Sequence, residues 1–336
     1  TGAGDNSGLR GWNADRGTTI LGLKKGDIIE SINDVPIVEK VGYSFNGWYT
    51  DEDGNSYYYE NKNTYPADLM DQVKKGIEHI ESIMGKKFAD ENIDITKTWL
   101  HYACRTAIIA NSFLHNLEGV NVQQVGVSGV SWGGYITSII TGYDERFAFS
   151  APHYITVGQK ESNTPLSALL KAHPSFEIFD NPEPLMLSNT PYNLIVSDAD
   201  QWANIIDDSE VVHSTNNGQV SIIYGFLHSH YHSMVQPESY AFADAVLKGK
   251  YKADMTWKGK ELTISTDYQV RYMAVVSTNE ETITSTSKWY AKEVDMNSYK
   301  NGKVKVNPRN DATYFYLSFA DENGAIHSSP IQKVSN

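Results

Sequence analysis

The sequence predicts an α/β fold, a parallel sheet with flanking helices, followed by a C-terminal all-β sandwich domain. Short apolar strands alternate with helical segments between residues 99 and 250, a pattern typical of parallel sheets that are covered on both faces. A serine between glycines separates one of these strands from the next helix. After residue 250, short alternating strands are punctuated by the turns Asn301-Gly302 and Asn323-Gly324, which favours a sandwich.

The first hundred residues are polar and rich in aromatic side chains. We expect a Gly-rich loop, a short helix and an apolar strand in turn, over residues 1–8, 9–16 and 18–23. Residues 24–65 contain the turn signal Asp53-Gly54 and are expected to form a small β module or a lid. Apolar residues at helical spacing predict a helix over residues 68–84.

The predicted sheet begins after a strongly apolar helix over residues 99–117, which carries Cys104. Because this is the only cysteine, no disulfide can form within the chain, and its apolar surroundings predict a buried, inert thiol. Pro237 suits the first turn of the last predicted helix. Strands are expected over residues 123–128, 147–151, 192–197 and 220–224, and helices over residues 132–141 and 237–247.

The predicted sandwich occupies residues 251–336. Its expected strands include residues 261–265, 270–276, 303–306 and 313–319. Trp257, Trp289 and Tyr290 would offer a carbohydrate-binding face if their rings were exposed. The simpler expectation is that these rings pack in the core or against the preceding domain.

The strongest functional signal is the run Gly129-Val130-Ser131-Trp132-Gly133-Gly134. It follows a strand and opens a helix, which is the context that a G-x-S-x-G nucleophile elbow requires. A sharp turn exposes the hydroxyl of Ser131, and side chains in place of the glycines would collide with the adjoining strand and helix. The backbone N–H of Trp132 is expected to stabilise an oxyanion. A purely structural Gly-rich turn is the alternative.

A serine hydroxyl needs a base, and the base needs an orienting acid. In this type of site the acid and the histidine follow the serine in chain order. Asp198 and Asp200 lie just beyond the strand predicted over residues 192–197. We assign Asp200 as the acid, because its spacing from Ser197 is the one such loops favour, and keep Asp198 as the alternative. Two solvated turn aspartates would be the non-functional interpretation.

Three histidines in the loop after the last parallel strand compete for the role of general base: His228, His230 and His232. His230 lies seven residues before Pro237, which favours it, and His228 is the next candidate. Alternate positions share one face of a strand, so three imidazoles there could also hold zinc. Because no carboxylate or cysteine stands nearby in the sequence, we expect no metal and no other cofactor.

Charge and hydropathy exclude some partners. Lys and Arg number 28 against 41 Asp and Glu, and the net charge is −13. This charge argues against nucleic acid and anionic membrane surfaces as partners. No apolar run approaches the roughly 18 residues of a membrane span, and nothing predicts the oligomeric state.

Residues 99–250 resemble the α/β-hydrolase superfamily, in particular acetyl-xylan-esterase-like and prolyl-oligopeptidase-like serine hydrolases of bacteria. The resemblance is carried by the elbow run and by residues 99–103, 110–117, 125–135, 142–147, 227–230 and 240–244. It implies an α/β-hydrolase parallel sheet with Ser131 as the nucleophile and Asp200 as the acid. The base would then be one of the pair His228 and His230.

The same family resemblance extends weakly into the first residues. Residues 1–6 and 12–17 look like the Gly-rich oxyanion loop of the family and the helix after it, which implies a backbone donor at Gly4. The His-Gly that usually begins this loop is absent. Losing one oxyanion donor typically costs about 10²–10³ in rate, so a trimmed loop predicts a weaker enzyme.

A second resemblance covers residues 24–62. The run from Gly42 to Gly54 looks like a Listeria–Bacteroides repeat of the internalin type. In that family the repeat is a small β module on exported surface proteins, so the resemblance implies an extracellular or cell-surface location. A lid loop that forms a hairpin with aromatic pairs is the alternative.

These inferences divide the chain into a catalytic domain (residues 1–23 and 66–250), an inserted β module or lid (residues 24–65) and a sandwich (residues 251–336). The expected function is a serine hydrolase that cleaves a small-molecule or carbohydrate ester, such as an acetylated sugar. One alternative is an S9-type amino- or oligopeptidase on the same machinery. The other is a catalytically weak surface-binding module that keeps the hydrolase fold.

Overall fold

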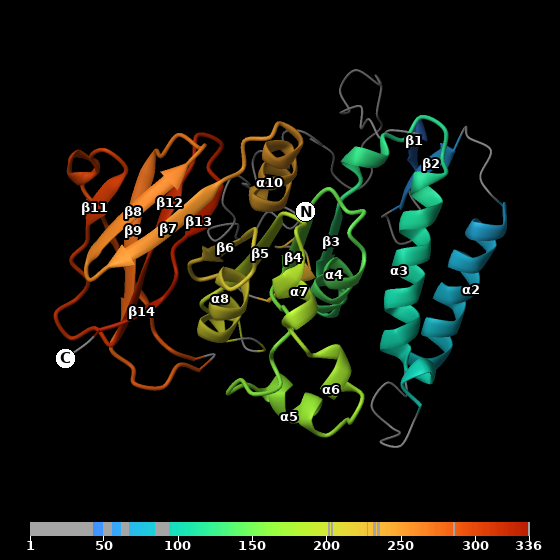
Figure 1. The fold of residues 1–336 in the computed structure, drawn as a ribbon, viewed down its shortest axis with the longest axis horizontal. Coiled ribbons are helices and arrows are strands. Elements are labelled where there is room, and N and C mark those ends of the chain that lie inside the picture. The colour runs from blue at the N-terminus through green and yellow to red at the C-terminus, as the bar shows by residue number, and fades with distance from the viewer. Residues whose placement is uncertain are drawn as a thin grey trace, which may run out of the picture.

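The computed structural model describes residues 43–49, 56–61, 67–84 and 94–334, except residues 201, 203, 227, 231, 232, 234, 235 and 285. The loop, helix and strand expected over residues 1–8, 9–16 and 18–23 lie outside these described residues. Figure 1 shows the described elements as a row, with a helical pair at one end, the main sheet and its helices in the middle, and the C-terminal strands at the other end.

Four parallel strands form the centre of the main sheet: β3 (Val127–Val130), β4 (Ser150–His153), β5 (Tyr192–Ser197) and β6 (Gly218–Ile223). Strands that are consecutive in the chain are neighbours in the sheet. Every residue of β4 and β5 is buried, as expected where helices cover both faces of a parallel sheet. The predicted parallel arrangement is therefore confirmed for these four strands.

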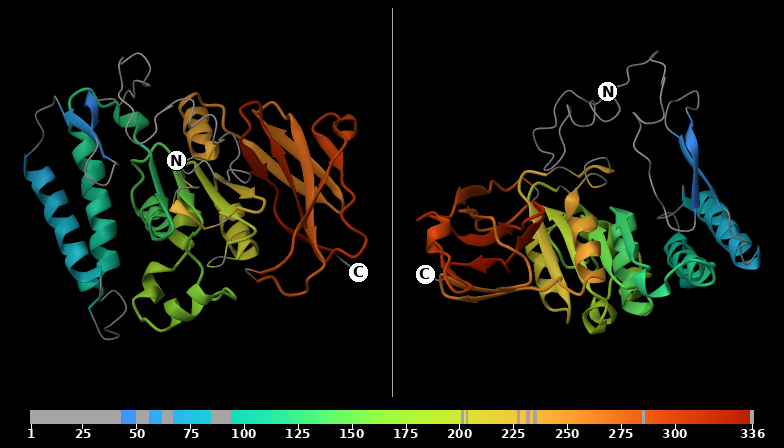
Figure 2. Two further views of the ribbon diagram at one scale, coloured as in Figure 1. Left: turned by 180° about the vertical axis from the view of Figure 1, so that it is seen from behind. Right: turned by 90° about the horizontal axis from the view of Figure 1, so that it is seen from above.

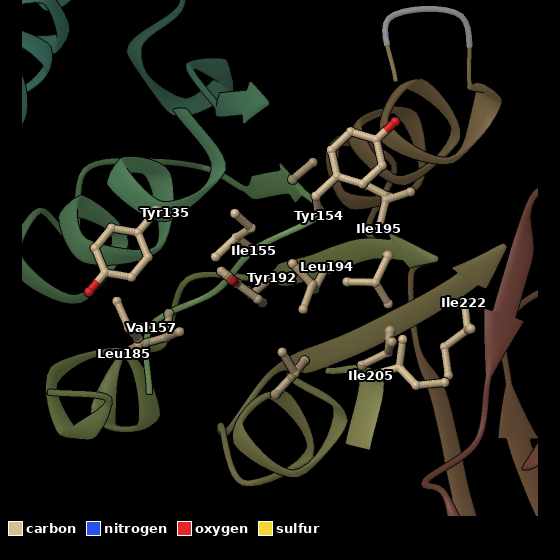
Figure 3. Packing of buried hydrophobic residues seen from close by; sticks show 14 of the residues in the cluster. Tyr135, Tyr154, Ile155, Val157, Leu185, Tyr192, Leu194, Ile195, Ile205 and Ile222 are labelled. Carbon is tan, nitrogen blue, oxygen red and sulfur yellow. The ribbon is translucent and has the colours of Figure 1, made fainter. Parts of the chain in front are cut away.

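Helices pack on both faces of the four strands. These helices are α4 (Trp132–Tyr143), α8 (Ile205–His213) and α10 (Pro237–Leu247), and α3 (Trp99–His115) packs against α4. Helix α4 contacts β3 and β4, α8 contacts β5 and β6, and α10 contacts β4 and β5. In Figure 3 the strands lie between α8 on one side and α10 on the other. Three short helices precede β5: α5 (Pro165–Lys171), α6 (Phe176–Phe179) and α7 (Glu183–Leu187).

The main hydrophobic core fills the space between this sheet and its helices (Figure 3). Leu194 and Ile195 of β5 and Tyr135 of α4 are completely buried. Burying one such side chain contributes about 1.5–3 kcal/mol, so the centre of the sheet is firmly held. Cys104 of α3 is also buried, and burial raises the pKa of its thiol to about 12, in line with the expected inert thiol.

The C-terminal strands form two antiparallel layers. One layer contains β9 (Tyr272–Thr278), β10 (Tyr290–Glu293), β12 (Tyr314–Ala320), β13 (Ile326–Ser328) and β14 (Gln332–Lys333). The other contains β7 (Ala253–Lys258), β8 (Glu261–Thr266) and β11 (Lys303–Lys305). Side chains from both layers share a second hydrophobic core, which includes Leu262, Val275 and Leu317.

The first of these layers is not separate from the main sheet. Strand β13 pairs with β6 through Ser328 and Val220, so one mixed sheet runs in the order β10-β9-β12-β13-β6-β5-β4-β3. The independent sandwich domain expected over residues 251–336 is therefore not confirmed. The sequence could not show this connection, because an alternating strand carries no mark of the partner it pairs with.

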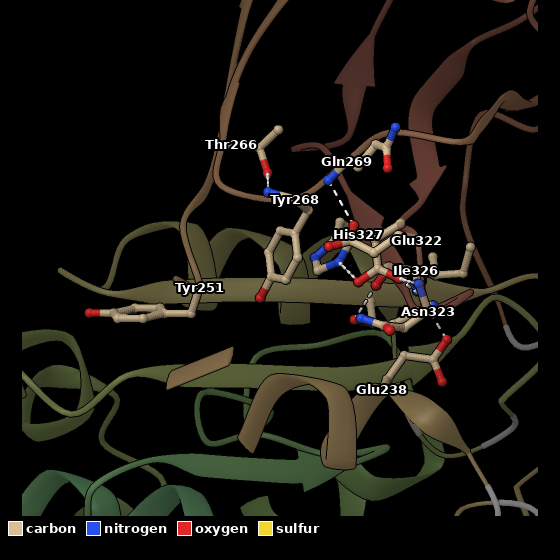
Figure 4. Close-up of polar contacts among 12 residues, drawn as sticks. Glu238, Tyr251, Thr266, Tyr268, Gln269, Glu322, Asn323, Ile326 and His327 are labelled. Carbon is tan, nitrogen blue, oxygen red and sulfur yellow. Dashed lines mark hydrogen bonds and ion pairs between the residues drawn. The ribbon is translucent and has the colours of Figure 1, made fainter. Parts of the chain in front are cut away.

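Polar contacts also tie α10 to the C-terminal strands (Figure 4). The buried carboxylate of Glu238, in the first turn of α10, accepts the backbone N–H of Ile326 at 3.1 Å. Close by, His327 contacts the carboxylate of Asp321 at 3.2 Å, and its ring lies 4.2 Å from that of Tyr268. The Glu238–Ile326 bond, like the β6–β13 pairing, therefore joins the C-terminal strands to the part of the fold that holds the parallel strands.

The three aromatic residues considered as a carbohydrate-binding face do not form one. Trp289 is 5% exposed and packs against Tyr316. Trp257 packs against a neighbouring ring, and its indole N–H donates to a backbone carbonyl. Tyr290 is exposed, but the guanidinium of Arg309 lies over its ring at 4.1 Å. The two tryptophans therefore follow the simpler expectation that these rings pack against other residues.

The described residues before position 94 form a hairpin and a helix. Strands β1 (Tyr43–Tyr49) and β2 (Ser56–Asn61) pair antiparallel around the predicted turn. Helix α2 (Ala67–Met84) lies where the helical spacing predicts it and packs along α3 (Figure 2). Among the helices that the structure describes, none has the length and apolar character needed to cross a membrane.

Candidate active site

Ser131 lies in a strained turn between β3 and α4. Its backbone has φ 59° and ψ −120°, in the left-handed region that non-glycine residues rarely adopt. A Cβ on Gly129 would come within 2.2 Å of the carbonyl oxygen of Gly133, and a Cβ on Gly134 within 2.4 Å of that of His153. A Cβ on Gly133 would meet nothing within 4 Å. Two glycines therefore permit the close strand–helix approach, while the third leaves space beside the serine.

The turn is anchored to the neighbouring strand. The backbone N–H of Ser131 donates to the carbonyl of His153 at 3.2 Å, and its own carbonyl accepts the N–H of Tyr135 at 3.0 Å. Trp132 is the first residue of α4, so its N–H lies at the helix terminus where N–H groups have no intrahelical acceptor. Helix termini of this kind stabilise negative charge. Gly4, the other expected oxyanion donor, lies outside the described residues.

The side chain of Ser131 contacts an imidazole. The Nε2 atom of His228 lies 2.9 Å from the Oγ atom of Ser131. His228 is in the loop after β6, at the same edge of the sheet as the serine, because the carboxyl ends of parallel strands meet at one edge. The His228 side chain is 13% exposed, so water has limited access to this contact.

The other imidazole nitrogen contacts a carboxylate. The Nδ1 atom of His228 lies 2.7 Å from the Oδ2 atom of Asp200, which has no exposed side-chain surface. The second carboxylate oxygen accepts the backbone N–H of Trp202 at 2.8 Å. A carboxylate only accepts hydrogen bonds, so Nδ1 carries the proton, and Nε2 is left to accept the proton of the Ser131 hydroxyl.

Two of the competing candidates, Asp198 and His230, make other contacts. The carboxylate of Asp198 accepts the N–H of Gly225 at 2.6 Å, and burial raises its pKa from 3.8 to about 6. His230 is exposed, and its carbonyl accepts the hydroxyl of Ser233. The preference for His230 over His228 rested on its spacing from α10, and that spacing does not decide which imidazole turns toward the elbow. In the structure His228 is the one within hydrogen-bonding distance of Ser131.

The metal interpretation has no support in the described part of the chain. No group of three or more His, Cys, Asp or Glu side chains there could hold a metal ion. His228 is instead engaged by Ser131 and Asp200 at its two nitrogens. His232, the third member of the histidine run, lies outside the described residues.

The sequence did not single out Tyr154, which follows β4. Its ring lies 4.3 Å from that of His228 in a stacked arrangement. Its backbone is also left-handed, with φ 77°. The available signal was its position directly after a buried strand next to β3, where side chains at the carboxyl edge gather around a site.

A second buried carboxyl, Asp208 of α8, lies behind the acid. Gln159 donates to it at 2.7 Å through its Nε2 atom. Burial raises the pKa of Asp208 well above its ordinary value, and the charge of Asp200 raises it further. The neutral form of Asp208 is therefore favoured.

A cavity of about 790 Å³ lies away from these residues, between α10 and the C-terminal strands. Its lining includes Tyr240, Tyr268 and Glu322 but none of Ser131, His228 and Asp200. A cavity of this volume could hold a small ligand. The convergence of a serine hydroxyl, an imidazole and a buried carboxylate is the more specific criterion for a reaction site, and it favours the elbow.

Comparisons with known proteins give one family match. Residues 9–70 match the Listeria-Bacteroides repeat domain, which includes the predicted repeat and extends it at both ends. The match also takes in residues 9–23, which the sequence analysis assigned to the hydrolase. A comparison with curated protein sequences found no match.

Solved structures give distant likenesses. A glucuronoyl esterase from Sporotrichum thermophile aligns over 48% of this chain and 57% of its own, with 12% identity and a TM-score of 0.35. DcsB, in complex with a substrate analogue, aligns over 47% of this chain and 73% of its own, with 13% identity and a TM-score of 0.33. The serine hydrolase CCSP0084 from Cycloclasticus zankles aligns over 45% and 71%, with 11% identity and a TM-score of 0.31. The aligned part thus spans 57% of the glucuronoyl esterase.

The parallel strands, the helices on both faces and the strained serine between β3 and α4 are features of the chain itself. Residues 9–70 match the Listeria-Bacteroides repeat domain family.

Proposed function

We propose that this chain is a serine hydrolase that cleaves a carboxylic ester by two-step acyl transfer. The observation that carries the proposal is the contact chain from the Ser131 hydroxyl through the His228 imidazole to the buried Asp200 carboxylate. In this account Ser131 is the nucleophile, His228 the general base and Asp200 the acid that orients it. The roles follow from the geometry of the three groups rather than from their positions in the chain.

Acylation begins when the Ser131 Oγ atom attacks the ester carbonyl carbon. His228 takes the hydroxyl proton on Nε2, and the resulting imidazolium is stabilised by Asp200 at Nδ1. The carbonyl oxygen becomes an oxyanion, to which the backbone N–H of Trp132 donates from the start of α4. The C–O bond to the alcohol then breaks, and the imidazolium returns its proton to the leaving alcohol oxygen.

Deacylation repeats these roles with water as the nucleophile. His228 removes a proton from the water, whose oxygen attacks the acyl carbon bound to Ser131. The second tetrahedral intermediate releases the carboxylic acid and restores the serine hydroxyl. The residues in this account need no metal and no organic cofactor.

The proposed substrate is an acetylated carbohydrate or another small acyl ester. Related peptidases usually add a propeller or an acidic pair that binds the substrate amine, and the sequence shows no propeller repeats. The net charge of −13 disfavours strongly anionic substrates. The match of residues 9–70 to a repeat family supports an extracellular or cell-surface location.

The test of this function is hydrolysis of p-nitrophenyl acetate by the wild-type chain and by Ser131→Ala, with an aminoacyl p-nitroanilide assayed in parallel. The proposal expects the acetate to be hydrolysed by the wild type only. Preferential hydrolysis of the anilide would support the amino- or oligopeptidase alternative instead. Equal rates for the wild type and Ser131→Ala would show that Ser131 takes no part in the reaction.

One observation favours a second candidate, a surface-binding module with weak activity. The repeat match begins at residue 9 and so occupies the helix and strand expected directly after the oxyanion loop. If these residues serve the repeat, the site relies more heavily on Trp132 for oxyanion stabilisation. This candidate expects a folded wild-type protein that neither hydrolyses the acetate nor reacts with a fluorophosphonate.

A further inference from the structure

Tyr154 holds the loop that carries the base. Its hydroxyl donates to the carbonyl of Ser229 at 2.8 Å and accepts the backbone N–H of the same residue at 3.1 Å. Its ring stacks on His228 at 4.3 Å and on Phe226 at 5.4 Å. One side chain therefore contacts the imidazole and the residues on either side of it in this loop.

Tyr154 is itself held firmly. Its side chain has no exposed surface, and its backbone N–H donates to the carbonyl of Ile195 on β5 at 2.8 Å. Figure 3 shows it beside Ile195 at the carboxyl end of β4. The left-handed φ of 77° is uncommon for a bulky residue and turns the chain sharply where β4 ends. Strain of this kind persists where the surrounding contacts over-determine it, often at functional sites.

Burial raises the pKa of the Tyr154 hydroxyl above its ordinary value, which favours the neutral form of this hydroxyl. It can therefore donate to one backbone group and accept from another at the same time. The two bonds fix the Ser229 peptide groups, while the ring fixes the plane of the imidazole. A tyrosine ring face also attracts a cation within about 6 Å, so the stack favours the imidazolium that forms during acyl transfer.

We propose that Tyr154 is a positioning residue for the proposed acyl transfer, holding the His228 imidazole against the Ser131 Oγ atom through the ring stack and the two hydrogen bonds to Ser229. This inference rests on the proposed function for its kinetic consequence. Its structural content, a fixed orientation of the imidazole, is independent of that function. A misplacement of about 1 Å can cost about 100-fold in rate, so the loss of such a support is measurable.

Tyr192 offers a matched control. It is a completely buried tyrosine on the adjacent strand, and its hydroxyl also makes two hydrogen bonds, to Ser138 at 2.8 Å and Thr156 at 2.9 Å. It contacts none of Ser131, His228 and Asp200 in these bonds. Tyr192→Phe and Tyr154→Phe therefore remove the same group from similar surroundings, and only the second alters the His228 loop.

The experiment measures kcat and KM for p-nitrophenyl acetate with the wild type, Tyr154→Phe, Tyr154→Leu and Tyr192→Phe, all as the full chain and below their unfolding temperatures. We expect kcat to fall about tenfold in Tyr154→Phe, which keeps the ring, and about 100-fold in Tyr154→Leu, which loses ring and hydroxyl. KM should stay within about twofold, because Tyr154 has no exposed surface for a substrate to contact. Tyr192→Phe should keep the wild-type kcat.

Equal kcat values for Tyr154→Phe and Tyr192→Phe, with both proteins folded, would overturn the inference. If Tyr154→Leu does not fold, the comparison of the two phenylalanine variants still decides it. A fall in stability without a fall in kcat would assign Tyr154 a purely structural role and would likewise overturn the inference.

A spectroscopic readout separates this inference from the proposed function. In protein labelled with ¹⁵N-histidine, the Nδ1–H proton of His228 bound to Asp200 should give a protected resonance, assigned by its loss in His228→Gln. We expect the resonance to persist in Tyr192→Phe and to broaden or vanish in the Tyr154 variants, even if the wild type hydrolyses no ester. An unchanged resonance in Tyr154→Phe and Tyr154→Leu would overturn the positioning role, whereas an inactive wild type with the expected spectra would overturn only the function.

Discussion

The Nε2 atom of His228 lies 2.9 Å from the Oγ atom of Ser131, although 97 residues separate the two in the chain. The parallel sheet makes this meeting possible. Ser131 follows β3 and His228 follows β6, so both leave the sheet at its carboxyl edge. The imidazole then turns toward the serine because Asp200 and Tyr154 hold it from two other directions.

His228→Ala should abolish esterase activity, whereas His230→Ala should retain it within about threefold. Of these two histidines, His228 contacts the hydroxyl of Ser131, while His230 is exposed. Removing the base of a triad leaves about 10³–10⁴-fold catalysis over water from the remaining groups. Steady-state assays of both variants check this, and a larger loss in His230→Ala than in His228→Ala would exchange their assigned roles.

Asp200→Asn should lower kcat by about 10³–10⁴, because an amide at this position no longer fixes the proton on Nδ1 of His228. Asp208→Asn is the matched control. Asp208 is buried nearby, but burial already favours its neutral form, which an amide imitates. The kcat/KM of Asp208→Asn should stay within about threefold of the wild-type value. Comparable losses in the two variants would show that the charge on Asp200 is not what orients the base.

Asp198→Asn should make the protein more stable at pH 8 and leave its stability unchanged near pH 3.5. Burial raises the folded-state pKa of Asp198 from 3.8 to about 6, so the folded chain binds a proton more tightly than the unfolded chain. The stability of the wild type therefore falls as the pH rises from about 4 to 6, by up to about 3 kcal/mol. The amide carries no charge and keeps an acceptor for the Gly225 N–H.

Urea unfolding of the wild type and Asp198→Asn at several pH values checks this dependence. The difference in the free energy of unfolding should grow between pH 4 and pH 6 and stay constant above. A variant that is less stable than the wild type at pH 8 would mean that ionised Asp198 contributes more through its hydrogen bond than burial costs it.

Gly129→Ala and Gly133→Ala should change the stability of the folded protein in opposite directions. The added methyl of Gly129→Ala would meet the Gly133 carbonyl at 2.2 Å, and overpacking of this kind costs about 1–3 kcal/mol or more. The methyl of Gly133→Ala meets open space, and alanine favours a helix over glycine by about 1 kcal/mol. Thermal melting of both variants distinguishes these cases, and equal stabilities would contradict the close packing of the elbow.

Much of the sheet could be predicted because its pattern is local. Strand β5 and helix α10 have the predicted bounds, since the apolar run Leu194–Val196 within β5 and a Pro-initiated helix are strong local signals. Strand β3 begins four residues later than predicted, because Asn121 caps a single 3₁₀ turn over Val122–Gln124. The helices α5, α6 and α7 were not predicted, since helices of four to seven residues show too little periodicity.

Pairing across the C-terminal strands was not predictable in the same way. The contact of Ser328 with Val220 joins the two regions of the sheet, and strand pairing depends on tertiary contacts rather than on the pattern of either strand. The sequence therefore could not show that β13 continues the main sheet, and the separate sandwich domain expected over residues 251–336 is not confirmed.

The candidate site, like the sheet, could be predicted only in part from the sequence. Ser131 and Asp200 each come shortly after a strand, and in the structure both side chains contact the imidazole of His228. The choice between His228 and His230 depends on how one loop turns, which sequence spacing does not determine. Tyr154 carried only a positional signal, since its role comes from contacts with residues 72 or more positions away.

The most direct test of the central claim is covalent labelling by a fluorophosphonate, followed by peptide mass spectrometry. The account predicts one label on Ser131 in the wild type and in His230→Ala, no label in Ser131→Ala, and strongly slowed labelling in His228→Ala. A folded wild type that does not react, or a label that persists in Ser131→Ala, would contradict the assignment of Ser131 as an activated nucleophile.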